Sequence, residues 1–238
     1  MTETEAREEI CRVGKSLFMR GYVHATAGNI SVQLAPQEGG GYLITPTDAC
    51  LGFLDPARLA RLNADGQQTS GDPGSKTIVL HQRIYAASAG TDAPARCIIH
   101  THSTHCVALT LQAPVTDAHP PPDVSRELLP ALTPYFVMKV GHVPVIDYRR
   151  PGDPQAAEAV ANAIARYQAR GTSIRAVMLE RLGPNVWHSS PTAAMATLEE
   201  LEETAKLWQL ACHNQAGAPL PLAADQIVDL RQAFGARW

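Results

Sequence analysis

The sequence lacks long apolar runs, blocks of like charge and paired cysteines. No stretch approaches the roughly 18 consecutive apolar residues that a membrane helix needs, and the acidic, amphipathic segment 1–14 is unlike a signal peptide. Lys and Arg number 20 against 23 Asp and Glu, and the formal net charge of −3 is not concentrated in any patch. This balance argues against a nucleic-acid surface or a polybasic membrane patch. We therefore expect a cytoplasmic protein that has neither nucleic acid nor membrane as a partner.

Several familiar motifs are also missing. The five cysteines are scattered and none forms a CxxC pair, so the sequence indicates neither a disulfide framework nor a zinc knuckle. There is no GxGxxG and no Walker sequence, which argues against a dinucleotide-binding fold. The chain shows no internal repeat or linker, and its 238 residues, 45% of them hydrophobic, are enough to bury one core. We expect one domain over residues 1–238.

Hydrophobic periodicity predicts helices and strands that intermingle without a strict βαβ rhythm. The pattern therefore favours a single domain of the α/β class with α+β character. The spacing predicts helices over residues 3–20, 75–88, 151–171, 190–212 and 225–234, and a short helix capped by Asp55. Strands are expected at residues 29–34, 42–45, 96–100, 137–146, 174–179 and 185–187, with a proline-rich surface loop at 113–123.

A His-Thr-His sequence ends the apolar strand CIIHTH. Side chains two residues apart in a strand project to the same face, so His100 and His102 can point at one metal ion. A catalytic zinc needs three protein ligands, so another residue would have to complete the site. A purely structural pair at a strand end is the alternative. His105, three residues further on, is better explained as a capping or supporting residue.

Three turns are rich in small and hydroxyl-bearing residues: TAGNIS at 26–31, LITPT at 43–47 and SGDPGSK at 70–76. Glycines let backbone N–H groups approach a ligand closely, and the third turn carries a lysine. Such turns suit a phosphate or another anion. Each one alone is better explained as an ordinary turn, but all three flanking the His-Thr-His strand favour an anion site.

Taken in order, TAGNISV, LITPT, the serine loop and CIIHTHS resemble the class II aldolase/adducin family. The resemblance continues through LTPYFVMKVG, RPGDPQ and EELEETAKLW, and so covers nearly the whole chain. It implies a three-layer fold with a central, mostly antiparallel sheet flanked by helices. It also implies a homotetramer with sites between subunits. The later segments most resemble the branch that decarboxylates 3-oxo-tetronate 4-phosphates. The resemblance therefore implies a carbon–carbon lyase that acts on a small phosphorylated sugar acid, and a divalent metal ion, usually zinc, as cofactor.

The resemblance also assigns roles to individual positions. The metal ligands would be His100 and His102, and Tyr135 would be a catalytic residue that donates or accepts a proton, unless it is a core tyrosine with a satisfied hydroxyl. Lys76, a cation at the edge of the third turn, is the second candidate catalytic residue. The substrate phosphate would be held by Asn29, Thr45, Thr47 and Ser75.

Two positions depart from the family pattern. Leu182 stands where the family has a third histidine, and Thr77 stands where it has a carboxylate. Leucine cannot bind a metal and threonine is a poor substitute for a carboxylate. The residues that could complete the site are Glu180, His188, His105 and Asp72. The alternatives to a decarboxylase are a sugar-phosphate aldolase or epimerase of the same family, or a non-catalytic member with a degraded metal site.

Overall fold

The computed structural model describes residues 1–111, 126–213 and 219–238. Its centre is a mixed sheet with the strand order β4-β3-β2-β1-β5-β8-β7-β6. Neighbouring strands are antiparallel except for β6 and β7, which are parallel. The strands are β1 (Asn29–Gln33), β2 (Tyr42–Ile44), β3 (Ala60–Leu62), β4 (Gln68–Ser70), β5 (Cys97–His100), β6 (Val145–Ile146), β7 (Ala176–Leu179) and β8 (Gly183–His188). This architecture confirms the predicted fold class.

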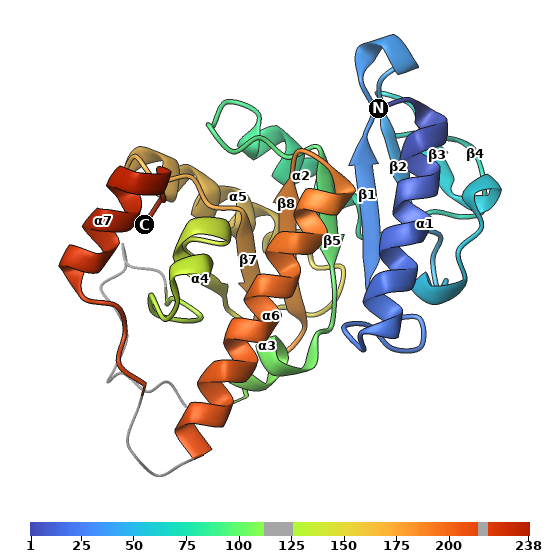
Figure 1. The fold of residues 1–238 in the computed structure, drawn as a ribbon. Helices are drawn as coiled ribbons and strands as arrows, with labels where there is room; N and C mark the ends of the chain where they lie inside the picture. Colours follow the sequence, from blue (N-terminus) through green and yellow to red (C-terminus); the bar gives the residue numbers. More distant parts are fainter. Residues whose placement is uncertain (112–125, 214–218) are drawn as a thin grey trace.

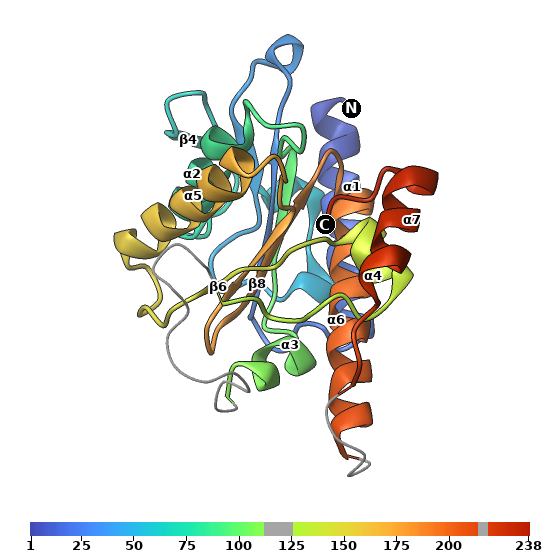
Figure 2. The same cartoon turned by 90° about the vertical axis from the view of Figure 1, so that its left-hand side faces the viewer.

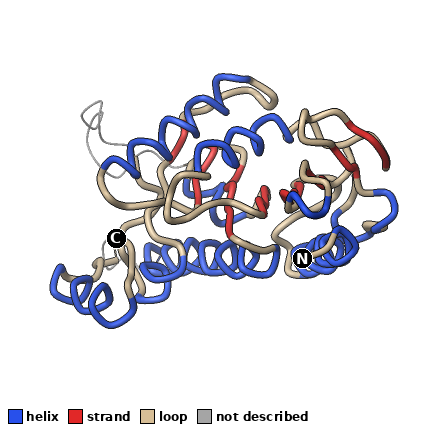
Figure 3. The backbone as a smooth tube through the Cα atoms, turned by 90° about the horizontal axis from the view of Figure 1, so that it is seen from above, coloured by secondary structure: helices blue, strands red, loops and turns tan. Residues whose placement is uncertain are grey.

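Helices cover both faces of the sheet, as Figures 2 and 3 show. One face carries α2 (Ile78–Ser88) and α5 (Pro154–Ala169), which pack against each other. The opposite side carries α1 (Glu3–Met19), α3 (Thr104–Leu109), α4 (Pro134–Lys139), α6 (Pro191–His213) and, outside α4, α7 (Ala224–Phe234). Short 3-10 turns occur at Pro36–Glu38, Leu51–Phe53 and Pro56–Arg58. No helix in the described ranges is long and apolar enough to cross a membrane.

Each helical layer encloses its own apolar cluster. The α1/α6 side buries side chains such as Ile10, Leu198 and Ile99, whereas the α2/α5 side buries Ile84, Val160 and others with the opposite face of the sheet. Strand β5 contributes to both clusters because its successive side chains point to opposite faces. The two clusters fix β5, which lies between β1 and β8 in the middle of the sheet (Figure 1) and ends at His100, the first residue of the histidine pair.

The structure confirms the predicted helices and strands with one correction, and one predicted loop lies outside the described residues. The strand expected over 137–146 is wrong for most of its length, because residues 137–139 belong to α4 and only Val145–Ile146 form a strand, β6. Helix α4 begins at Pro134 because proline is favoured in a first turn and because the Thr133 hydroxyl accepts a hydrogen bond from Phe136 N at 3.0 Å. The proline-rich segment 113–123 lies outside the described residues.

Candidate functional site

The three hydroxyl-rich turns meet at one place. Asn29 Nδ2 donates to Thr77 Oγ1 at 3.3 Å, and Ser75 Oγ donates to the same oxygen at 3.3 Å. The second turn joins them because Ser75 N donates to Thr45 O at 3.1 Å and Thr47 Oγ1 donates to Gly74 O at 2.9 Å. We call these five side chains, Asn29, Thr45, Thr47, Ser75 and Thr77, the cradle. Thr45 is only 1% exposed, and its hydroxyl oxygen accepts a hydrogen bond from Ile30 N, so it stabilises the strand pair.

The cradle adjoins the histidine pair through the register of the sheet. Asn29 is the direct partner of His100 between the antiparallel strands β1 and β5. Gly28 makes this approach possible, because its φ is +85° and a Cβ there would lie 2.8 Å from His100 O. The glycine of the TAGN sequence therefore lets the first turn lie directly against the end of β5.

The two predicted metal ligands lie side by side. The ring centroids of His100 and His102 are 5.0 Å apart. His100 is buried, and its Nδ1 lies 3.0 Å from Pro184 O, which as an acceptor fixes the proton on Nδ1 and leaves the Nε2 lone pair free. Burial, together with the neighbouring His102, lowers the pKa of His100 to about 3. Burial also lowers the pKa of His102. Both rings are therefore neutral near pH 7.

The described residues do not complete the metal site of the family around these rings. No group of three histidine, cysteine or acidic side chains that could hold a metal ion occurs in the described ranges. Leu182 packs against the apolar cluster under α2 and α5, and the Thr77 hydroxyl is occupied within the cradle. A tightly held zinc ion needs at least one more protein ligand than His100 and His102 provide.

The four residues considered as replacements are engaged elsewhere. The carboxylate of Glu180 accepts hydrogen bonds from Arg126 and from Tyr148 N. Asp72 forms an ion pair with Arg58, and His105 Nδ1 lies 2.8 Å from the buried Glu202 carboxylate. His188 is the partner of Cys97, at the opposite end of β5 from His100. The metal role of the histidine pair thus stays a prediction that the described residues support only in part.

Sequence reasoning missed a third imidazole next to the pair. The His24 ring, in the loop between α1 and β1, lies 6.5 Å from the His102 ring in an edge-to-face arrangement. The signal was its position two residues before the TAGN sequence, which places it at the same edge of the sheet. Three imidazoles therefore follow one another from the buried His100 outward to the exposed His24.

A buried polar network behind the pair was also missed. His81 of α2 lies 2.8 Å from Ser31 Oγ through Nδ1, and Ser31 Oγ lies 2.7 Å from Tyr85 OH. Burial, with a smaller effect from His100, lowers the pKa of His81 to about 3. Asn185, the strand partner of His100 on β8, lies beside His81. The fully buried network thus supports the sheet under the histidine pair.

The two predicted catalytic residues lie at different distances from this centre. Lys76 is exposed and sits between Ser75 and Thr77 in the third turn, so it belongs to the same region. Tyr135 is on α4, packed on α6 and α7, with 63% of its surface exposed. No contact among the described residues joins Tyr135 to the histidines or to the cradle.

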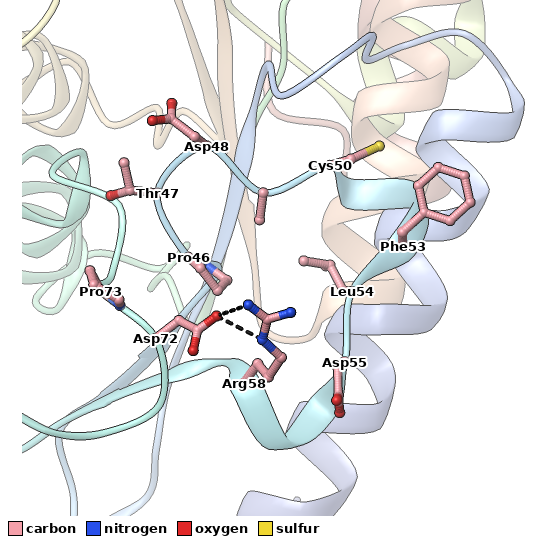
Figure 4. Close-up of a pocket in the computed structure, with 11 residues that line it drawn as sticks. Pro46, Thr47, Asp48, Cys50, Phe53, Leu54, Asp55, Arg58, Asp72 and Pro73 are labelled. Carbon is pink, nitrogen blue, oxygen red and sulfur yellow. Dashed lines mark hydrogen bonds and ion pairs between the residues drawn. The ribbon is translucent and has the colours of Figure 1, made fainter.

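A cavity of about 490 Å³ opens next to the cradle and is lined in part by Pro46 and Thr47 of the second turn (Figure 4). Thr47 lines it together with Pro73, and so do Arg58 and Asp72, which form an ion pair with Nε and Oδ2 2.7 Å apart. Neither His100 nor His102 lines this cavity. It therefore is not the space in front of the histidine pair.

Comparison with known proteins places this site in a family. The class II aldolase and adducin N-terminal domain matches residues 8–209. The chain is 51% identical to a 3-oxo-tetronate 4-phosphate decarboxylase of Cupriavidus necator, over 100% of this chain and 99% of that protein. It is 39% identical to an Escherichia coli protein of the same name, over 86% of each. The chain is also similar to the crystal structure of Escherichia coli YgbL, described as a putative aldolase/epimerase/decarboxylase, with 35% sequence identity and a TM-score of 0.80 over 96% of this chain and 99% of that one.

The chain belongs to the class II aldolase/adducin family, which confirms the predicted resemblance. The family works with a divalent metal ion. Its members near this chain are lyases by name, in agreement with the predicted enzyme class.

Proposed function

We propose that this protein is a carbon–carbon lyase that decarboxylates a 3-oxo-tetronate 4-phosphate to a triose phosphate and CO2. The observation that carries the proposal is the direct contact between a hydroxyl-rich cradle and the histidine pair, in a chain 51% identical to a decarboxylase of that name. A phosphate in the cradle would leave the rest of a four-carbon chain in front of the histidines.

After the substrate has bound, the reaction has two steps, the loss of CO2 and the protonation of C2. The bond between C1 and C2 breaks, its electron pair moves to C2 and is delocalised onto the C3 carbonyl oxygen, and CO2 leaves. The resulting enediolate then takes a proton at C2. Because a β-keto acid already contains its electron sink, the site has only to orient the substrate and to stabilise the charge that develops on one oxygen.

The chain's own side chains suit these tasks. We assign the phosphate to Asn29, Ser75 and Thr47, with Thr45 as a buried support. His100 Nε2, which has a free lone pair, would accept a hydrogen bond from the C2 hydroxyl. Lys76, the cation of the third turn, would stabilise the oxygen on which negative charge develops. No step here depends on an ion held by the two histidines.

The exposed Tyr135 fits a site on a second copy of the chain better than a site on its own. Its helix belongs to the α1/α6 side, and its side chain is 63% exposed. We propose that the protein is a homo-oligomer, with four copies as in the predicted tetramer, in which Tyr135 supplies the proton for C2 at a neighbouring subunit's cradle. Mixing Tyr135→Phe with Lys76→Met subunits would restore part of the activity if the two residues serve one site from different chains.

The direct test is formation of triose phosphate from 3-oxo-tetronate 4-phosphate, measured against the spontaneous loss of CO2 in buffer. Lys76→Met should lower kcat at least tenfold, because a charged donor to the developing oxyanion is lost. Lys15→Met, an exposed lysine on α1, serves as the matched control. A wild-type rate equal to the buffer rate would overturn the proposed reaction. Cleavage of a sugar phosphate in that case would point to the aldolase alternative, and no turnover of either to a non-catalytic member.

A further inference from the structure

The loop between α1 and β1 holds His24 in place by its backbone and not by its side chain. Val23 is 2% exposed, and Ala27 N donates to His24 O at 2.9 Å. Ala25 has a φ of +47°, an uncommon value for a residue with a Cβ, and Gly28 lies against His100 O. The loop therefore has a defined turn that is pressed onto the end of β5.

The His24 side chain itself is free to meet a ligand. It is exposed, and in the part of the chain that the structure describes no hydrogen bond or ion pair involves its ring. Its nearest ring neighbour is His102 at 6.5 Å between centroids. The fixed backbone places this imidazole beside the site, and its ring N–H is available to a substrate group.

The contacts around the site follow one another in a definite order. Thr77 contacts Asn29, Asn29 pairs with His100, the His100 ring neighbours His102, and His102 neighbours His24. The cradle is at one end of this succession and His24 at the other. A sugar acid phosphate whose phosphate lies in the cradle thus directs its opposite end, the carboxylate, toward His24.

We propose that His24 is a specificity-determining residue that donates a hydrogen bond to the carboxylate of the sugar acid phosphate. The proposal rests on the proposed function for the position of the phosphate. It goes further in naming the group that distinguishes a sugar acid from a sugar at this site. An imidazole N–H gives a carboxylate a charge-assisted hydrogen bond, whereas an uncharged hydroxymethyl group in the same place gains much less from it.

The test compares the binding of three ligands that carry different groups for the cradle and for His24. Erythronate 4-phosphate carries both phosphate and carboxylate, erythritol 4-phosphate has a hydroxymethyl group in place of the carboxylate, and inorganic phosphate probes the cradle alone. Binding is measured by calorimetry on the full-length protein. His24→Leu should bind erythronate 4-phosphate about tenfold more weakly, with the other two affinities unchanged. His24→Gln, which keeps an N–H donor, should recover most of the loss.

His213→Gln, an exposed histidine at the end of α6, is the matched control and should bind all three ligands as the wild type does. Equal affinity of wild type and His24→Leu for erythronate 4-phosphate would overturn the proposal. A uniform loss of all three ligands would also overturn it, because His24 would then only shape the cradle loop. A wild type that binds these ligands but forms no triose phosphate would remove the proposed reaction alone. A wild type that binds none of them would remove both.

Discussion

Thr77 Oγ1 accepts a hydrogen bond from Asn29 Nδ2 at 3.3 Å, at the position where the family resemblance places a carboxylate. The Thr77 hydroxyl links Asn29 and Ser75 within the cradle, whereas a carboxylate at this position would bring a negative charge next to the histidine pair. With Thr77 and Leu182 at two of the four ligand positions that the resemblance implies, only the imidazoles of His100 and His102 are left of that ligand set. The metal-binding role of the histidine pair can therefore be tested by placing metal ligands at positions 77 and 182.

We expect the purified protein, dialysed against metal-free buffer, to retain well below one zinc ion per chain, because two protein ligands hold zinc weakly. The double variant Thr77→Glu with Leu182→His should approach one ion per chain by elemental analysis. The pair Thr77→Gln with Leu182→Asn has similar shapes and weaker ligands, and should stay at the wild-type level. One full equivalent of zinc in the wild type would show that residues outside this set complete the site.

Replacing Gly183 should lower the stability of the protein, because the backbone at this position leaves no room for a side chain. A Cβ at this position would lie 1.9 Å from Thr101 O, and the backbone φ of +144° is open to few residues other than glycine. We expect Gly183→Ala to lower the free energy of unfolding by about 3 kcal/mol or more, measured by urea denaturation. Gly90→Ala, where no heavy atom lies within 4 Å, is the control and should be nearly neutral. Equal stability of the two variants would contradict the close packing of β8 on the histidine turn.

The hydrophobic pattern predicted most helices and strands correctly, because in the longer elements it repeats several times. Helix α1 shows its apolar face over 17 residues, and α6 over 23. Helix α4 has only six residues, fewer than two turns, and it lies among apolar residues that suit a strand equally well. The misassignment of 137–146 follows from that ambiguity.

The candidate site was predictable only as separate pieces. Motif order and family resemblance selected the cradle turns and the histidine pair, but the register that makes Asn29 the partner of His100 is a long-range property of the sheet. His24 and His81 were missed for the same reason. Each reaches the pair from another element, the α1–β1 loop and α2, and no local spacing connects them to residues 100–102.

Glu202 should stabilise the segment that follows the histidine pair. Its carboxylate accepts hydrogen bonds from His105 N at 2.8 Å and from Cys106 N at 3.0 Å, and so caps α3 from α6. Burial alone would raise the pKa of Glu202, but these hydrogen bonds and those of the two side chains outweigh it and lower the pKa. We expect Glu202→Ala to cost about 3 kcal/mol of unfolding free energy, because the buried N–H of Cys106 and the part-buried N–H of His105 lose their acceptor.

Glu202→Gln keeps one acceptor oxygen and should cost less than Glu202→Ala. Because the pKa of Glu202 is lower in the folded chain than in the unfolded one, its contribution is present above about pH 4.5 and declines as the pH falls below that value. Urea denaturation of both variants at pH 7 checks the order. An alanine variant as stable as the wild type would show that α3 does not depend on this cap.

His81 should make the protein less stable in mild acid. Its pKa is about 3 in the folded chain, mainly because of burial, against 6.5 for a free side chain. Below pH 6.5 the unfolded chain takes up a proton that the folded chain does not, so the stability due to His81 is full above that pH and falls as the pH decreases. At pH 5 the loss amounts to about 2 kcal/mol.

His81→Gln, which has no such proton, should therefore lose about 2 kcal/mol less than the wild type between pH 7.5 and pH 5. His213→Gln should follow the wild-type curve, because that side chain is exposed. Parallel curves for the wild type and His81→Gln would mean that His81 is protonated as easily in the folded chain as in the unfolded one, and that the network with Ser31 and Tyr85 opens to water.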